Sequence, residues 1–124
     1  MTMIALMMLA GISRCAAPDF CPSDEQLMAA VRGQDGAALQ QAVDDTAQND
    51  PGSIVMIHGE RIRRVSDVLC GEVIARERPD EPPAVLCKFT VRYWSRDAHS
   101  VARMVKRPEG WEIDASLSVS RDRR

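Results

Sequence analysis

Most of the short motifs that mark a catalytic or cofactor site are missing from this chain of 124 residues. It has no Gly-rich phosphate loop, no G-x-S-x-G nucleophile turn, no H-E-x-x-H metal motif and no C-x-x-C redox pair. Its two histidines, His58 and His99, do not stand at a metal-ligand spacing. We therefore expect no cofactor and no metal.

A strong net charge is also missing, since the formal charge is −2 at pH 7. A balance this close to neutral argues against nucleic acid as a partner, because general binding to nucleic acid needs a basic surface. Acidic residues dominate Asp19–Asp50, and basic residues are in slight excess after Pro51. This arrangement predicts an acidic helical layer beside a mildly basic sheet.

No apolar run is long enough to span a bilayer, which takes about 20 residues. The uncharged run Met3–Ile12 instead has the length of the apolar region of a secretory signal, although no Lys or Arg precedes it. Cleavage after Ala17 would leave Pro18 first, which is unfavourable. We predict that residues 1–17 are a targeting segment and that the protein is exported to the periplasm or cell envelope. The alternative is a cytoplasmic protein with a packed N-terminal helix.

Cys15 follows the apolar run at a position similar to that of the lipidated cysteine of bacterial lipoproteins. Arg14 departs from that pattern, because the processing enzyme needs a small residue there. Cys15 is thus a candidate lipid anchor, and simple secretion is favoured. Removal of residues 1–17 would leave three cysteines, with Cys21 free, paired between chains or buried.

The first half of the remaining chain has a helical pattern. After a linker over residues 18–23, Ser23 and Gln26 form a capping box that starts a helix. Gly33–Gly36 interrupts the pattern, which predicts two short helices or one kinked helix. Asn49–Gly52 ends any helix. The α+β domain is predicted over residues 24–119, followed by a charged tail, 120–124.

The second half has the period of strands. Residues 62–75 form an irregular strand with a bulge at Gly71, and a proline-rich turn follows. Clean alternation marks strands after residue 84, over 101–106 and over 111–119. The predicted inner face carries Phe89, Val91, Trp111, Ile113 and Leu117, covered by Leu27, Val31, Leu39 and Val43 of the helix.

Cys70 and Cys87 lie on either side of the proline-rich turn. If they face each other in an antiparallel pair, the centre of the hairpin falls between Arg78 and Pro79, inside that turn. Leu69 then meets Lys88, and Val73 meets Ala84. We predict a disulfide between Cys70 and Cys87; the alternative is two buried thiols in a reduced protein.

The fold class is thus α+β, with one or two N-terminal helices packed on a curved antiparallel meander sheet of three to four strands. This layout resembles cystatin-like and nuclear-transport-factor-like domains, and small bacterial exported proteins of that shape. The resemblance covers roughly residues 24–118 and rests on the Cys70–Cys87 pair and the closing strand from Glu109. The Gln-x-Val-x-Gly loop of cystatin-type inhibitors is absent, so protease inhibition is not implied.

A basic, partly aromatic surface is predicted from Arg92, Trp94, Arg103 and Lys106. Such a surface suits an acidic partner such as a peptide, a polysaccharide or a lipid head group. We therefore expect a non-catalytic envelope protein that binds a partner or small ligand through its sheet face or a pocket. The alternative is a small periplasmic enzyme that uses the open end of the sheet, with His58 or His99 as base.

Overall fold

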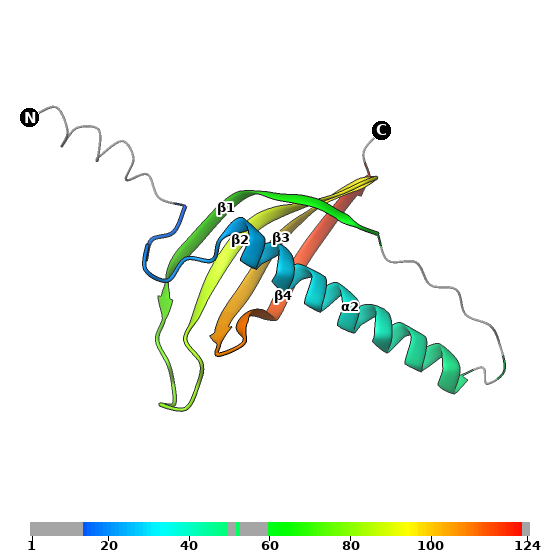
Figure 1. The fold of residues 1–124 in the computed structure, drawn as a ribbon, viewed down its shortest axis with the longest axis horizontal. Coiled ribbons are helices and arrows are strands. Elements are labelled where there is room, and N and C mark those ends of the chain that lie inside the picture. The colour runs from blue at the N-terminus through cyan, green and yellow to red at the C-terminus, as the bar shows by residue number, and fades with distance from the viewer. Residues whose placement is uncertain (1–13, 50–51, 53–59, 123–124) are drawn as a thin grey trace, which may run out of the picture.

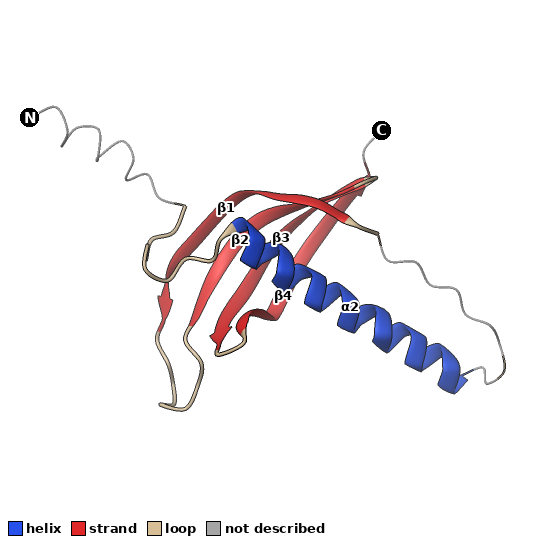
Figure 2. Ribbon diagram, viewed as in Figure 1, coloured by secondary structure: helices blue, strands red, loops and turns tan. Residues whose placement is uncertain are grey.

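The computed structural model describes residues 14–49, 52 and 60–122. One helix, α2, precedes four strands that form an antiparallel meander in the order β1-β2-β3-β4. The helix lies across one face of this open sheet and contacts both β1 and β4 (Figures 1 and 2). The predicted α+β class is confirmed. The elements are α2 (Asp24–Asn49), β1 (Ile62–Ile74), β2 (Ala84–Tyr93), β3 (Arg96–Arg107) and β4 (Gly110–Asp122).

The helix begins at the predicted capping box. The backbone N–H of Ser23 donates to Gln26 Oε1 at 2.8 Å, and the N–H of Gln26 donates to Ser23 Oγ at 3.1 Å. The predicted interruption at Gly33–Gly36 is wrong, because α2 continues through both glycines to Asn49. A glycine costs a helix only about 1 kcal/mol relative to alanine, which the packing of the neighbouring turns offsets.

Only the first half of α2 is anchored in the core. Its buried residues are Leu27, Ala30 and Val31, whereas Leu39 and Val43 are only partly buried. The second half runs out past the sheet (Figure 1). The expectation that Leu39 and Val43 cover the sheet therefore holds only in part, since the helix leaves the sheet before their side chains are enclosed.

The hairpin of β1 and β2 has the predicted register. Cys70 pairs with Cys87, and Leu69 pairs with Lys88. The two cysteines form a disulfide, so the predicted bond is confirmed. A bulge beyond Cys70, around Gly71, shifts the register, so Val73 meets Val85 instead of Ala84.

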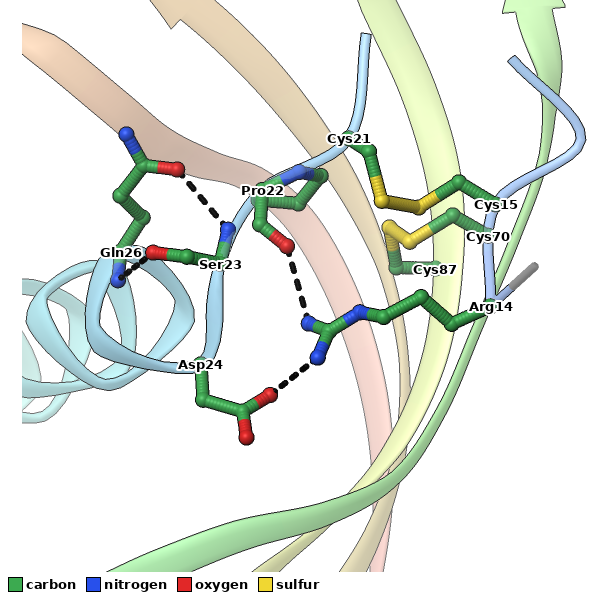
Figure 3. A network of polar contacts seen from close by, with 9 residues as sticks. All are labelled: Arg14, Cys15, Cys21, Pro22, Ser23, Asp24, Gln26, Cys70 and Cys87. Atoms are coloured by element: carbon green, nitrogen blue, oxygen red, sulfur yellow. Dashed lines mark hydrogen bonds and ion pairs between the residues drawn. A yellow bond between two sulfur atoms is a disulfide. The ribbon is translucent and has the colours of Figure 1, made fainter. Parts of the chain in front are cut away.

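The chain before the helix is fastened to β1. Cys15, only 1% exposed, forms a second disulfide with Cys21, so Cys21 has a partner within the chain while residues 14–17 are retained. Ala16 N–H donates to the carbonyl of Cys70 at 2.9 Å, and Cys70 N–H donates to the carbonyl of Arg14 at 2.7 Å. Figure 3 shows the two disulfides side by side. The end of the predicted targeting segment and the predicted linker are thus both packed in this structure.

The core contains the predicted residues of β2 and of the first helical turns, but the prediction for Leu117 is wrong. Phe89, Val91 and Leu27 are buried, whereas Leu117 is 82% exposed. Ile113 pairs with Met104 and Ala115 with Arg103, so Asp114 is an extra residue that reverses the alternation of side chains in β4. The strand also continues to Asp122, into the predicted charged tail.

Two matched truncations test this reversal. We expect Leu27→Ala to lower the free energy of unfolding by about 2–5 kcal/mol, because it opens a cavity in the core. Leu117→Ala should change it by less than about 0.5 kcal/mol, because the side chain is in solvent. Urea unfolding followed by circular dichroism measures both. A large loss for Leu117→Ala would show that β4 has the regular register.

Candidate functional site

The bulge in β4 places hydroxyl groups under the helix. Before Asp114, the side chains of Trp111 and Ile113 face α2; after it, Ser116 and the alternate serines face α2, while Leu117 and Val119 point to the opposite side. This part of the helix-facing sheet surface, which we call the polar floor, therefore carries hydroxyl groups where apolar side chains would ordinarily pack against a helix. The serines of this row are Ser116, Ser118 and Ser120, with Ser100 beside them on β3.

Each serine of the row has a hydrogen-bond partner. Gln34 Nε2 on α2 donates to Ser116 Oγ at 2.7 Å. The hydroxyls of Ser100 and Ser118 are 2.8 Å apart, and Arg96 Nη1 donates to Ser120 Oγ at 2.8 Å. The row thus joins the helix, β3 and β4 by side-chain bonds. None of these partners is a general base at neutral pH, so the serines lack the activation that a nucleophile requires.

Tyr93 ties the end of β2 to the helix. Its hydroxyl donates to Asp35 Oδ2 at 2.6 Å, and the Arg96 guanidinium lies 4.0 Å from the centre of its ring. Burial of the phenol, together with the hydrogen bond to the Asp35 carboxylate and its negative charge, raises the pKa of Tyr93 well above its ordinary value of 10. The phenol therefore stays protonated and acts as a fixed donor.

Glu60, two residues before β1, joins the same network. Its Oε1 accepts hydrogen bonds from the backbone N–H and the hydroxyl of Ser95, each at 2.6 Å, and its Oε2 lies 3.3 Å from Arg96 Nε. The Ser95 hydroxyl and backbone bonds, and then the charge of Arg96, lower the pKa of Glu60 below its ordinary value of 4.5. The carboxylate is therefore charged across the physiological range.

Two hollows lie between α2 and the sheet. The narrow one, about 140 Å³, runs over the serine row from Val31 to Tyr93. The wider one, about 520 Å³, lies where the helix leaves the sheet, and its walls include Leu39 and Ile62. Asp35 borders both. We refer to the two hollows together as the helix–sheet cleft. The wider volume is within the range of small-ligand sites.

Two exposed arginines border the wider hollow. Arg32 comes from the outer side of α2 and Arg61 from the residue just before β1. Within the described part of the chain neither forms an ion pair, whereas Arg92, Arg96, Arg103 and Arg107 all do. The wider hollow therefore has two guanidinium groups in its wall, together with the carboxylates of Asp35 and Glu60.

The four residues of the surface predicted from the sequence lie on two sides of the sheet. Arg92 bonds Asp97 at 2.8 Å, and Arg103 is paired with Asp114. Lys106 lies 5.8 Å from the ring of Trp111, which faces the helix side. Trp94 is exposed at the β2–β3 turn, with the Arg63 guanidinium 4.8 Å from its ring centre. Arg92 and Arg103 thus share the sheet face away from α2, where each is ion-paired, whereas Lys106 lies with Trp111 on the helix side.

The histidines predicted as a possible base, His58 and His99, and the predicted lipid anchor, Cys15, are located as follows. His99 contacts Thr90 Oγ1 at 3.1 Å, and its register partners place it on the face away from α2 and outside the cleft. His58 lies outside the described residues, so an enzymatic role through it stays a prediction. The Cys15 sulfur is bonded to Cys21, and a sulfur in a disulfide cannot carry a thioether-linked lipid. The two fates of Cys15 exclude each other.

The cleft is not evident from the sequence pattern. Ser116, Ser118 and Ser120 alternate so regularly with apolar residues that they read as a solvent face. One feature of the sequence does indicate a polar site under the helix. Gln34 and Asp35 are polar residues within one helical turn of Val31, which lies on the buried face of α2.

No protein-family model, no curated protein and no solved structure matches this chain. The resemblance to cystatin-like domains is therefore a statement about element order alone. Among the residues that the structure describes, no helix has the length and apolarity to cross a membrane. Within the same residues, no three side chains of His, Cys, Asp or Glu come together as metal ligands would.

The Glu60 network gives a pH-dependent prediction. Because the pKa of Glu60 is lowered in the folded state, its contacts stabilise the fold above pH 4.5, and this contribution is lost as the pH falls through the lowered value. Ser95→Ala should move the pKa of Glu60 back toward 4.5, as followed by NMR titration of its carboxyl carbon. Ser66→Ala, on the other side of the sheet, is the control. An unchanged pKa in Ser95→Ala would contradict the assigned contacts.

Proposed function

We propose that this protein is an exported, disulfide-stabilised binding protein without catalytic chemistry of its own, and that the helix–sheet cleft holds the carboxylate end of a peptide. The observation that carries the proposal is the serine row that the β4 bulge turns under the helix. Ser118 and Ser120 are exposed beside their protein partners, so their hydroxyls are also accessible to a ligand. The rest of the cleft limits the chemistry of that ligand.

The arrangement of groups favours an extended peptide. The hydroxyls of Ser116, Ser118 and Ser120 recur at every second residue of a strand, which is also the spacing of like-oriented groups in an extended chain. Leu39 and Ile62 offer the wider hollow apolar contact for a small side chain. Arg32 and Arg61 suit a terminal carboxylate, because guanidinium–carboxylate bonds are the stronger, charge-assisted kind.

Export is supported by the cysteines. Both disulfides persist only where the surroundings are oxidising, which fits the periplasm or the cell envelope. The apolar run Met3–Ile12 lies outside the described residues and supports export by its sequence alone. Because Cys15 is bonded to Cys21 and lies against β1, removal of a targeting segment before Arg14 preserves this structure, whereas cleavage after Ala17 discards Cys15.

The cleft is tested with one peptide in two forms. N-acetyl-Ser-Val-Ala with a free carboxylate should bind about tenfold more tightly than its C-terminal amide, because only the acid forms charge-assisted bonds to arginine. NMR titration of the amide signals of Ser116 and Ser118 gives both affinities. The double variant Arg32→Gln/Arg61→Gln should abolish the difference.

The matched control is Arg107→Gln, which removes an arginine at the β3–β4 turn and should leave the difference intact. Equal binding of acid and amide would contradict the proposal. So would signal changes that gather around Arg92 and Trp94, which would support the surface predicted from the sequence instead.

Export is tested by the intact mass of the protein isolated from its native host. We expect a mature chain that retains Cys15, lacks the mass of four hydrogens relative to its reduced form and takes up no thiol reagent before reduction. A chain that retains Met3–Ile12 and has free thiols would contradict export. A chain with a lipid on Cys15 would contradict the Cys15–Cys21 bond and establish the anchor.

A further inference from the structure

Asp35 holds a position in the helix–sheet cleft that no other described residue shares. It alone borders both the wider and the narrow hollow. Asp35 is half-buried, and its Oδ2 accepts the hydrogen bond from the Tyr93 hydroxyl at 2.6 Å. A ligand with one part in each hollow therefore lies against this carboxylate.

The two carboxylates of the cleft differ in how far their charge is neutralised. Glu60 accepts two hydrogen bonds from Ser95 and forms an ion pair with Arg96 at 3.3 Å. Asp35 forms no ion pair with any described residue, and its side chain has the neutral Tyr93 phenol as its partner. A carboxylate can accept about four hydrogen bonds. Asp35 thus keeps its charge and most of its capacity as an acceptor.

The arginines of the wider hollow leave the charge of Asp35 available. Arg32 lies about one helical turn before Asp35, and Arg61 lies just before β1. Both arginines border the wider hollow alone, whereas Asp35 also borders the narrow hollow over the serine row. A complementary ligand therefore carries a negative end for the arginines and a positive group where its chain passes from one hollow to the other.

The hydrogen bond from Tyr93 determines which cation suits Asp35. It engages Oδ2, and a guanidinium fork forms its strongest pair with both oxygens of a carboxylate. A lysine ammonium is compact and donates its hydrogen bonds without a fixed fork, so Oδ1 alone is a sufficient acceptor. The positive group that fits this position is therefore an ammonium.

We propose that Asp35 makes the cleft selective for a peptide whose last residue but one is lysine. The terminal carboxylate lies at Arg32 and Arg61, and the lysine ammonium binds Asp35 Oδ1. The preceding residues of the peptide follow the serine row. This selectivity rests on the proposed function, because the peptide must first bind with its carboxylate end in the cleft.

Two peptides that differ by one ammonium group test this selectivity in the full oxidised protein. N-acetyl-Ser-Lys-Ala with a free carboxylate should bind about tenfold more tightly than N-acetyl-Ser-norleucine-Ala, which has the aliphatic chain without the charge. NMR titration of the amide signals of Ser116 and Ser118 gives both affinities. Asp35→Asn should abolish the difference without weakening the norleucine peptide, because the new amide oxygen can still accept from Tyr93.

Asp45→Asn is the matched control. Asp45 is an exposed aspartate of the same helix that lines neither hollow, so the preference for lysine should persist in this variant. Asp35→Glu keeps the negative charge and should also retain the preference. Circular dichroism verifies that each variant is folded.

Equal affinities of the wild type for the two acids overturn the selectivity, and this result requires no variant. A lysine preference that survives Asp35→Asn, or that Asp45→Asn reduces equally, also overturns it. The C-terminal amide of the norleucine peptide separates the two proposals. Weaker binding of this amide than of its acid supports the carboxylate site whatever the lysine result, whereas no binding of any of these peptides overturns both proposals.

Discussion

One extra residue in β4, Asp114, decides what both faces of the sheet present. Without it, Leu117 and Val119 would complete an apolar floor beneath the helix and the serines would face water. With it, the floor becomes polar over half its length and the apolar side chains are displayed outward. Gln34, Ser100 and Arg96 supply partners for the hydroxyls, and Ser118 and Ser120 are also exposed to solvent.

The two disulfides stabilise the fold, and they offset the apolar burial that the small core loses at its polar floor. Two disulfides lie against each other where the N-terminal segment meets β1 and β2 (Figure 3). In the chain-entropy model, loops of these lengths are worth about 2 and about 3 kcal/mol. Arg14 extends the fastening to the helix, since it bonds the carbonyl of Pro22 at 2.9 Å and the carboxylate of Asp24 at 2.5 Å. The helix is therefore held at its start, and its far half needs no sheet beneath it.

The parts of the fold that depend on local chemistry could be predicted from the sequence. The Ser23–Gln26 cap, the end of the helix at Asn49 and the Cys70–Cys87 register each follow from residues that act over a few neighbours. The α+β class followed from the change of period between the two halves of the chain.

The parts that depend on tertiary packing could not be predicted. The alternation from Trp111 to Val119 is regular, so nothing local marks the bulge at Asp114, which is fixed by the pairing of β4 with β3. The helix runs through Gly33 because packing of its first turns outweighs a weak local preference. The cleft was missed for the same reason, since its serines face inward only after the bulge has formed.

The connectivity of the disulfides has a consequence for how the chain matures. The first cysteine is bonded to the second and the third to the fourth, so neither loop encloses the other. In a chain that emerges N-terminus first, Cys21 follows soon after Cys15, and Cys87 soon after Cys70. Disulfides that form in this order are the native ones. Oxidation can therefore proceed without reshuffling of wrong pairs, the slow step that burdens proteins with interleaved disulfides.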